Sequence, residues 1–250
     1  MRYLYSLAIC FLLAACGPQP PPAPLEETTE ETAETAGPAA VVALPALMQA
    51  PEQWSGRQIT LIAPLAGGPE RRVLGPGFSA EGEDAPVAID DPRRSLWLAD
   101  PLPPAVTSQL VEGANYLKLR GRLSPPGAYG TGERFLYQFS ADAASLLTPE
   151  RTTLTNLAGN RRALDAALLE VEGTLLATSQ GALVTTAISA GGVPAPGTRQ
   201  VKLGALPDQR ILDALEQSGE VRYGPVTIVG WWQGGLLTPF LVRPQTGSRQ

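Results

Sequence analysis

The chain has 250 residues and a formal net charge of −5, and it contains no histidine. The lack of histidine excludes a Ser-His-Asp triad, a Cys-His pair and any metal site or general base that uses imidazole. Glycine and proline number 26 and 25, about a fifth of the chain, which favours short strands and many turns over long helices. We expect a mainly β protein of one large or two small domains, since a domain usually has about 100–200 residues.

The N-terminus has the pattern of an export signal. One basic residue precedes the mostly apolar segment 4–15, which is shorter than the about 20 residues of a transmembrane helix. The segment runs into the letters LAAC at residues 13–16, which resemble the lipobox of bacterial lipoproteins. The resemblance implies that Cys16 receives a diacylglyceryl group and that residues 1–15 are removed as a lipoprotein signal peptide. The alternative is an ordinary signal peptide with an unrelated cysteine.

Lipidation of Cys16 predicts where the protein resides. Two or three acyl chains bind a bilayer firmly, so we expect a lipid-anchored protein on the extracytoplasmic side of the cell membrane or of an outer membrane. In lipoproteins of cells with two membranes, Asp after the cysteine signals retention in the inner one, and here Gly17 follows. The other cysteine, Cys10, lies in the signal peptide. The folded part therefore has no thiol for a disulfide, a metal or nucleophilic catalysis.

Residues 16–50 are predicted to form a disordered tether. Proline, alanine, threonine and glutamate dominate the segment, and its five glutamates have no basic partner there. Such a composition cannot bury enough apolar surface to fold, and its like charges favour an extended chain. The alternative is a proline-rich motif that binds a protein. The tether carries most of the net charge, so the body has no charge excess that favours binding to nucleic acid.

The rest of the chain shows one strand pattern twice, over residues 51–150 and 151–244. Each half has a strand, a strand that leads through Leu-Pro into a short amphipathic helix, a strand that ends near glycine, and a hairpin partner. The alternative is two unrelated β segments, because short alternating strands look alike. The matching segments are 58–66, 95–110, 115–124 and 134–141 in the first half, and 168–177, 200–215, 225–232 and 236–243 in the second.

Five short strands with one helix before the fourth resemble the OB-fold, a small Greek-key barrel. The resemblance covers about residues 51–148 and 153–243 and implies two tandem small β-barrels, each with one short helix. A pair of β-sandwich domains is the alternative, although sandwiches normally lack that helix. Within the strands we predict a bulge or bend at Gly121, and we predict a hairpin turn over residues 232–236.

Motifs for catalysis are missing from the sequence. It has no P-loop, no GxGxxG, no Gly-x-Ser-x-Gly elbow and no Ser-x-x-Lys, so we expect no enzyme activity, no cofactor and no metal. Glu170 and Glu172 share one strand face, where a carboxylate pair could serve glycoside hydrolysis. The favoured interpretation is the solvent side of a half-buried strand. The run Asp90-Asp91-Pro92 predicts a turn in preference to a cation site.

A hairpin over residues 124–139 is the best candidate for ligand binding. It places Tyr129 at a glycine-rich tip, with Arg120 and Arg122 on one strand and Arg134 on the next. Tyrosine and arginine on an OB-like sheet suit stacking on a sugar or a base. The alternative, which we favour, is a polar strand face that keeps the protein soluble, with a mobile loop.

The tryptophans divide into core and surface candidates. Trp231 and Trp232 are neighbours in a predicted strand, so their side chains point to opposite faces. One of them must face the core and the other is available as an exposed anchor, so Trp232 joins the candidate ligand-binding residues. Trp54 and Trp97 are predicted to lie in the core.

Taken together, the patterns predict a lipid-anchored, non-catalytic lipoprotein that binds a partner in the cell envelope or acts as a scaffold there. The alternative is a lipoprotein that binds an oligosaccharide through its OB-like sheet and the 124–139 hairpin. Neither the partner nor the number of subunits follows from the sequence.

Overall fold

The computed structural model describes residues 39–66, 72–80, 85–189 and 192–245. The described residues belong to one compact unit. Cys16, the predicted signal peptide and most of the predicted tether lie outside the described residues. The protein is mainly β, with 49% strand and 14% helix. No helix in the described part of the chain is long and apolar enough to cross a membrane.

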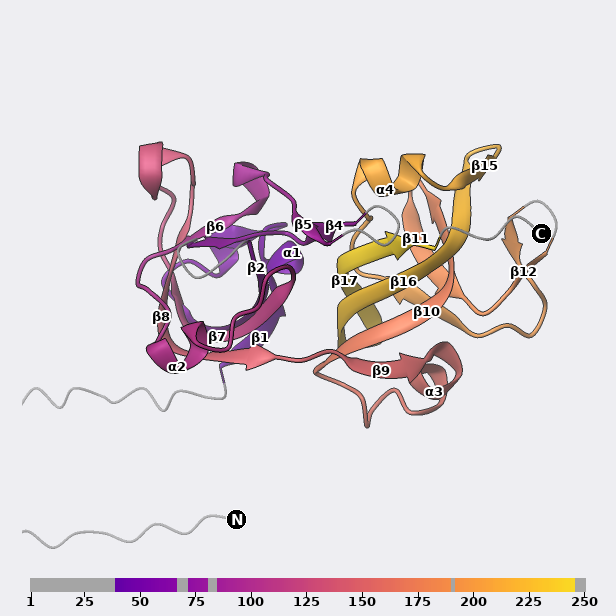
Figure 1. Cartoon of the computed structure of the whole chain (residues 1–250), viewed down its shortest axis with the longest axis horizontal. Coiled ribbons are helices and arrows are strands. Elements are labelled where there is room, and N and C mark those ends of the chain that lie inside the picture. Colours follow the sequence, from indigo (N-terminus) through magenta and orange to yellow (C-terminus); the bar gives the residue numbers. More distant parts are fainter. Residues whose placement is uncertain (1–38, 67–71, 81–84, 190–191, 246–250) are drawn as a thin grey trace, which may run out of the picture. The chain divides into compact units, whose positions relative to one another are not determined.

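Five strands of the first sheet form a closed barrel (Figure 1). Around the barrel the order is β2-β3-β6-β8-β7, and β7 pairs again with β2. The β6–β8 pair is parallel and the other four pairs are antiparallel. A sixth strand, β1 (Ala40–Ala43), adds to β2 in parallel. The barrel strands are β2 (Gln58–Leu65), β3 (Val73–Leu74), β6 (Leu96–Leu98), β7 (Asn115–Leu123) and β8 (Gln138–Leu147).

The second sheet has nine strands, five of which also pair in a ring. The ring order is β10-β11-β14-β17-β16, and β16 pairs again with β10. Here the β14–β17 pair is parallel. The ring strands are β10 (Ala167–Thr178), β11 (Gly181–Thr185), β14 (Gln200–Leu203), β16 (Val221–Gln233) and β17 (Leu236–Pro244). The other members are β4 (Phe78–Ser79), β5 (Val87–Ala88), β9 (Glu150–Thr153) and β15 (Glu216–Ser218), and a separate hairpin joins β12 (Ile188–Ser189) to β13 (Val193–Pro194).

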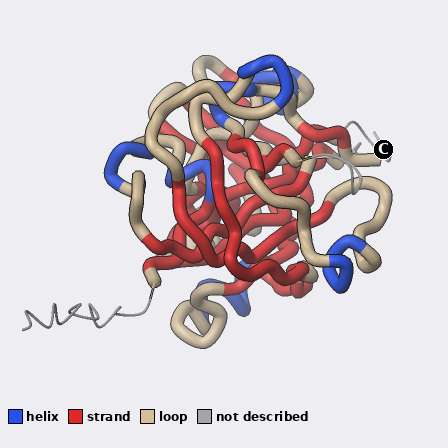
Figure 2. The backbone as a smooth tube through the Cα atoms, turned by 90° about the vertical axis from the view of Figure 1, so that its left-hand side faces the viewer, coloured by secondary structure: helices blue, strands red, loops and turns tan. Residues whose placement is uncertain are grey.

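The helices are short and lie at the periphery of the strands (Figure 2). Two of them occupy equivalent places, since α2 (Pro104–Thr107) lies between β6 and β7 and α4 (Gln209–Asp213) lies between β14 and β16. Proline begins α2, and the Asp208 side chain caps α4 by accepting a hydrogen bond from the Arg210 N–H. The predicted short helices are thus confirmed. The others are α1 (Leu44–Leu47), α3 (Leu154–Gly159), η1 (Pro51–Gln53), η2 (Pro92–Arg94) and η3 (Thr131–Glu133).

Part of the predicted tether is folded. Residues 40–47 form β1 and α1, and Leu44 and Leu47 are fully buried in the core of the first barrel. The prediction of a tether over 16–50 is therefore wrong at its C-terminal end. The physical reason is the apolar run AVVALPALM, whose burial offsets the loss of chain entropy that the acidic part of the segment cannot offset.

The core consists of three apolar clusters. One lies inside the first barrel and includes Leu61 and Phe139, and a second lies inside the ring of the second sheet and includes Trp232. The third joins both halves of the chain, with Ile62 and Tyr116 packed among residues that include Trp231. This shared cluster explains why the described residues belong to one compact unit.

The pairing of β7 is irregular at Gly121, where a bulge or bend was predicted, and the extra residue, Asp142, belongs to β8. The register of β7 against β8 shifts between Arg120 and Gly121, and the register of β16 against β17 shifts between Val229 and Gly230. A Cβ at Gly121 would collide with the main-chain oxygen of Ser140, and a Cβ at Gly230 would lie 2.7 Å from that of Thr238. Both strands therefore need glycine where the neighbouring main chain approaches closely.

Candidate functional site

The tip of the 124–139 hairpin is held by its own contacts. Tyr129 is half-buried, and its hydroxyl donates a hydrogen bond to the Pro125 carbonyl at 2.9 Å. Its main chain forms a β-bridge with Phe135. Arg134 is exposed and lies 3.4 Å from a carboxylate oxygen of Asp90. The tyrosine is thus packed into the hairpin, and the arginine is the part of the tip that extends into solvent.

The two arginines of β7 lie apart from that tip. Arg120 and Arg122 are exposed on the outer face of the barrel. The Arg122 Nε donates to the Gln58 side chain at 3.1 Å, and Gln58 donates in turn to Asp142 at 2.7 Å. Among the described residues, no hydrogen bond or ion pair joins either arginine to Tyr129. The structure therefore does not gather the predicted hairpin residues into one site.

Both neighbouring tryptophans of β16 are buried. Trp232 is 1% exposed in the core of the second sheet, where its indole N–H donates to the Arg161 carbonyl at 3.1 Å. Trp231 is 3% exposed on the other face of the strand, because the first half of the chain covers that face. The prediction of one exposed tryptophan anchor is therefore wrong, and Trp232 is not available to a ligand at the surface.

Trp97 does not lie in the core, where it was predicted. Its neighbours Leu96 and Leu98 are buried in the barrel, so Trp97 points to the outer face and is only half-buried. Its ring lies 5.7 Å from that of Phe135, with 31° between the planes, and the hairpin passes over it at Gly130. The alternation Leu-Trp-Leu is the signal that could have placed it. Trp54 is also half-buried and packs against the barrel core.

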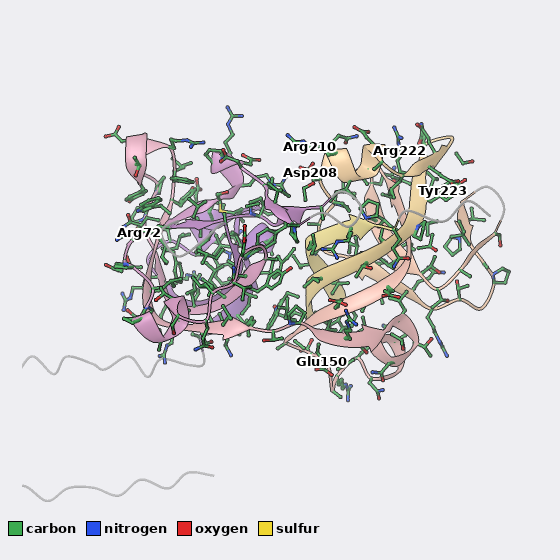
Figure 3. The ribbon with its side chains drawn as sticks, viewed as in Figure 1. Arg72, Glu150, Asp208, Arg210, Arg222 and Tyr223 are labelled. Atoms are coloured by element: carbon green, nitrogen blue, oxygen red, sulfur yellow. The ribbon has the colours of Figure 1, made fainter. Side chains whose placement is uncertain are left out.

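The run Asp90-Asp91-Pro92 forms a turn, as predicted. The Asp91 side chain accepts from the Arg93 N–H and caps η2. With Asp208 and Arg210 (Figure 3), these aspartates line a pocket of about 640 Å³ between the β4–β5 hairpin and α4. Its carboxylates already cap helices or pair with arginine. Within the described ranges, no three Asp, Glu, Cys or His side chains are grouped to hold a metal.

A second pocket lies where the two halves of the body meet, and we call it the junction pocket. It has a volume of about 420 Å³ and contains four charged side chains and one phenol. Its lining residues come from β7, β9, β10, β16, β17 and the adjoining loops. They are Pro86, Ala114, Tyr116, Pro149, Arg151, Glu170, Glu172, Thr227, Val229, Leu241 and Arg243.

Strand register explains the charges of the junction pocket. Glu170 and Glu172 alternate with buried residues on β10, so they share one face of the strand, as predicted. On β9, Arg151 is the register partner of Glu170, and its Nε lies 2.7 Å from the Glu170 carboxylate. Burial raises the pKa of Tyr116 far above its ordinary value of 10.0; Arg243 opposes that rise and Glu170 adds to it.

Comparison with known proteins found no family model, no curated protein and no solved structure that matches this chain.

Proposed function

We propose that the protein is an extracytoplasmic lipoprotein, held at a membrane by lipid on Cys16, whose folded body serves as a non-catalytic binding or envelope-scaffolding module. The observation that carries this proposal is the LAAC motif at 13–16 directly after the apolar segment 4–15. The acidic segment between Cys16 and β1 connects the anchor to the body. Two or three acyl chains give the stable membrane attachment that a single chain lacks.

We also infer that the body consists of two tandem OB-like barrels. In support, the order β2-β3-β6-β8-β7 of the first sheet corresponds strand by strand to β10-β11-β14-β17-β16 of the second. Counted along the chain, the third and fifth strands of each ring pair in parallel (β6 with β8, and β14 with β17). A short helix precedes each fourth strand, β7 or β16. In each ring the register between the fourth strand and the strand that follows it in the chain shifts at a glycine of the fourth strand, Gly121 or Gly230. OB-folds commonly bind chain-like ligands, which fits a binding role.

Metabolic labelling tests the anchor. Cells that express the full chain are grown with labelled palmitate, and the protein is recovered from the membrane fraction. We expect label in the wild type and in Cys10→Ser, and loss of both label and membrane attachment in Cys16→Ser. Label that persists in Cys16→Ser, or an unlabelled wild type in the soluble cytosol with its N-terminus intact, would contradict the proposal.

Oligosaccharide binding is the second candidate function, and the Trp97–Phe135 pair favours it. The half-buried indole of Trp97 on the outer face of a barrel offers a stacking surface, and Arg134, the chain neighbour of Phe135, offers an exposed hydrogen-bond donor on the same hairpin. On a glycan array we expect a signal that Trp97→Leu weakens about tenfold, with Arg120→Ala as a control that leaves it unchanged. An array without signal, or equal binding by Trp97→Leu, would exclude this function.

A further inference from the structure

The junction pocket has features that the proposed anchoring and scaffolding role does not use. It is a concave site of about 420 Å³, within the range of small-ligand sites. One wall is the outer face of β9, β10, β16 and β17, and Tyr116 of β7 contributes from the other half of the body. Its charged groups come from distant parts of the sequence, so only the folded body assembles them.

The polar atoms of Tyr116 and Arg243 are buried there without partners. Tyr116 is 4% exposed, and its ring packs against Phe78 and Phe240 at centroid distances of 5.7 and 6.1 Å. Its hydroxyl and the Arg243 Nε are buried and, among the described residues, have no hydrogen-bond partner. A buried polar atom without a partner destabilises the protein, so a ligand that accepts hydrogen bonds from both groups removes that cost on binding.

The remaining charges select the class of ligand. Arg151 and Glu170 form an ion pair at 2.7 Å and offset each other. In the described part of the chain, neither Glu172 nor Arg243 takes part in an ion pair. The four charges sum to zero, so an anion alone would be repelled by Glu172 and a cation alone by Arg243. A molecule that carries both charges complements both side chains.

Strand register sets the distance that such a molecule must span. Glu172 is the partner of Thr227 on β16, and Thr227 is the partner of Arg243 on β17. The two charged residues are therefore one strand apart, about 10 Å between their Cα atoms. Both side chains are long and can lean toward each other over Thr227. The gap between their charged groups suits a small molecule with a short spacer between its charges.

We propose that the junction pocket binds a small zwitterion of the amino-acid type, with its carboxylate held by Arg243 and the Tyr116 hydroxyl and its ammonium group held by Glu172. The cross-strand neighbour Thr227 lies beneath the bound molecule. The Arg151–Glu170 pair keeps Glu170 from competing with Glu172 for the ammonium group.

Calorimetric titration of the full-length protein in detergent tests this inference. The probes are glycine, 4-aminobutanoate and 6-aminohexanoate, which carry the same two charges on spacers of increasing length, with acetate and methylammonium as single-charge controls. We expect saturable binding of at least one zwitterion, and at least tenfold weaker binding of both controls. Arg243→Gln and Glu172→Gln are each expected to weaken binding at least tenfold, since each removes the charge that faces one end of the zwitterion.

Matched variants separate this role from a structural one. Glu150→Gln on β9 and Arg120→Gln on β7 remove exposed charges outside the pocket, and we expect them to bind like the wild type. Tyr116→Phe keeps the packed ring, so the free protein should melt no lower than wild type while it binds the zwitterion several-fold more weakly. The inference is overturned if no zwitterion binds saturably, if acetate binds as well as the zwitterions, or if the three pocket variants bind like the wild type.

Discussion

The two five-strand rings share an order of pairing but differ in how their last two strands are joined. In the first, β7 and β8 are linked by a long hairpin that packs Gly130 and Phe135 against Trp97. In the second, β16 and β17 are joined by Gly234 and Gly235, whose φ angles of 58° and 84° suit a tight hairpin turn. The predicted turn over 232–236 is thus confirmed. The difference teaches that one strand framework can present a loop for recognition in one half and a charged strand face in the other.

The strongest way to break this arrangement is to remove the contact between the halves. Phe240 is 2% exposed in the shared cluster, where it stacks on Tyr116. We expect Phe240→Ala to lower the free energy of unfolding by about 4 kcal/mol, because it leaves a large cavity. Thermal unfolding should change from one transition to two. A single transition with an unchanged midpoint would show that the cluster does not couple the halves, and Leu206→Ala, at an exposed leucine, is the control.

Substitution of Gly121 and Gly230 tests whether both rings need a residue without a Cβ at the register shift. We expect Gly121→Ala and Gly230→Ala each to cost about 2–3 kcal/mol in urea unfolding, because the added methyl group meets a main-chain oxygen of the neighbouring strand. The cost should be larger at Gly121, where the overlap is greater. Gly159→Ala places a methyl group in open space and is expected to be neutral. If Gly230→Ala is neutral as well, the two bulges are not equivalent.

The stability of the protein at alkaline pH tests the burial of Tyr116 where the two halves meet. Burial raises the pKa of Tyr116 above 10.0 in the folded state. Above pH 10 the unfolded chain therefore loses the Tyr116 proton while the folded chain keeps it. The stability that is fully present below pH 10 then falls by up to about 1.4 kcal/mol per pH unit as the pH rises toward the folded pKa. Urea unfolding at pH 9, 10 and 11 should show a steeper loss for wild type than for Tyr116→Phe. Parallel curves would contradict the buried hydroxyl.

The smallest effect is expected at the hairpin of the first ring. Arg134 and Asp90 form an exposed ion pair at 3.4 Å, and such pairs contribute little. We expect Arg134→Ala to change the free energy of unfolding by less than about 0.5 kcal/mol, measured by urea unfolding with Asp90→Ala as its counterpart. A larger loss would mean that the pair orders the hairpin.

Much of the strand framework could be predicted from the sequence. Apolar alternation predicts the long strands, and proline and glycine mark the short helices and the turns. The start of the folded body was missed because averaging over residues 16–50 concealed the apolar run at 40–47. The burial of Trp231 could not be predicted, because it depends on packing between halves that are distant in the sequence.

The candidate sites were less accessible from the sequence. Glu170 and Glu172 were correctly placed on one strand face, but only the fold brings Tyr116 and Arg243 to them. The prediction that Trp97 lies in the core is wrong, because in the alternation Leu-Trp-Leu the two leucines face the core and the tryptophan faces outward. A site whose residues come from both halves has no short sequence motif, because each strand shows only which of its own residues share a face.

The β4–β5 hairpin has a consequence for how the protein avoids self-association. It belongs by sequence to the first half, yet β4 pairs in parallel with β17 beside Leu241 and Val242. Along β17, β14 pairs only near Leu236 and Leu237, so β4 covers backbone that would otherwise be free to recruit another chain. Uncovered strand edges promote aggregation. A fragment of residues 151–244 produced alone should therefore aggregate. In the intact chain the β4–β5 hairpin covers that edge.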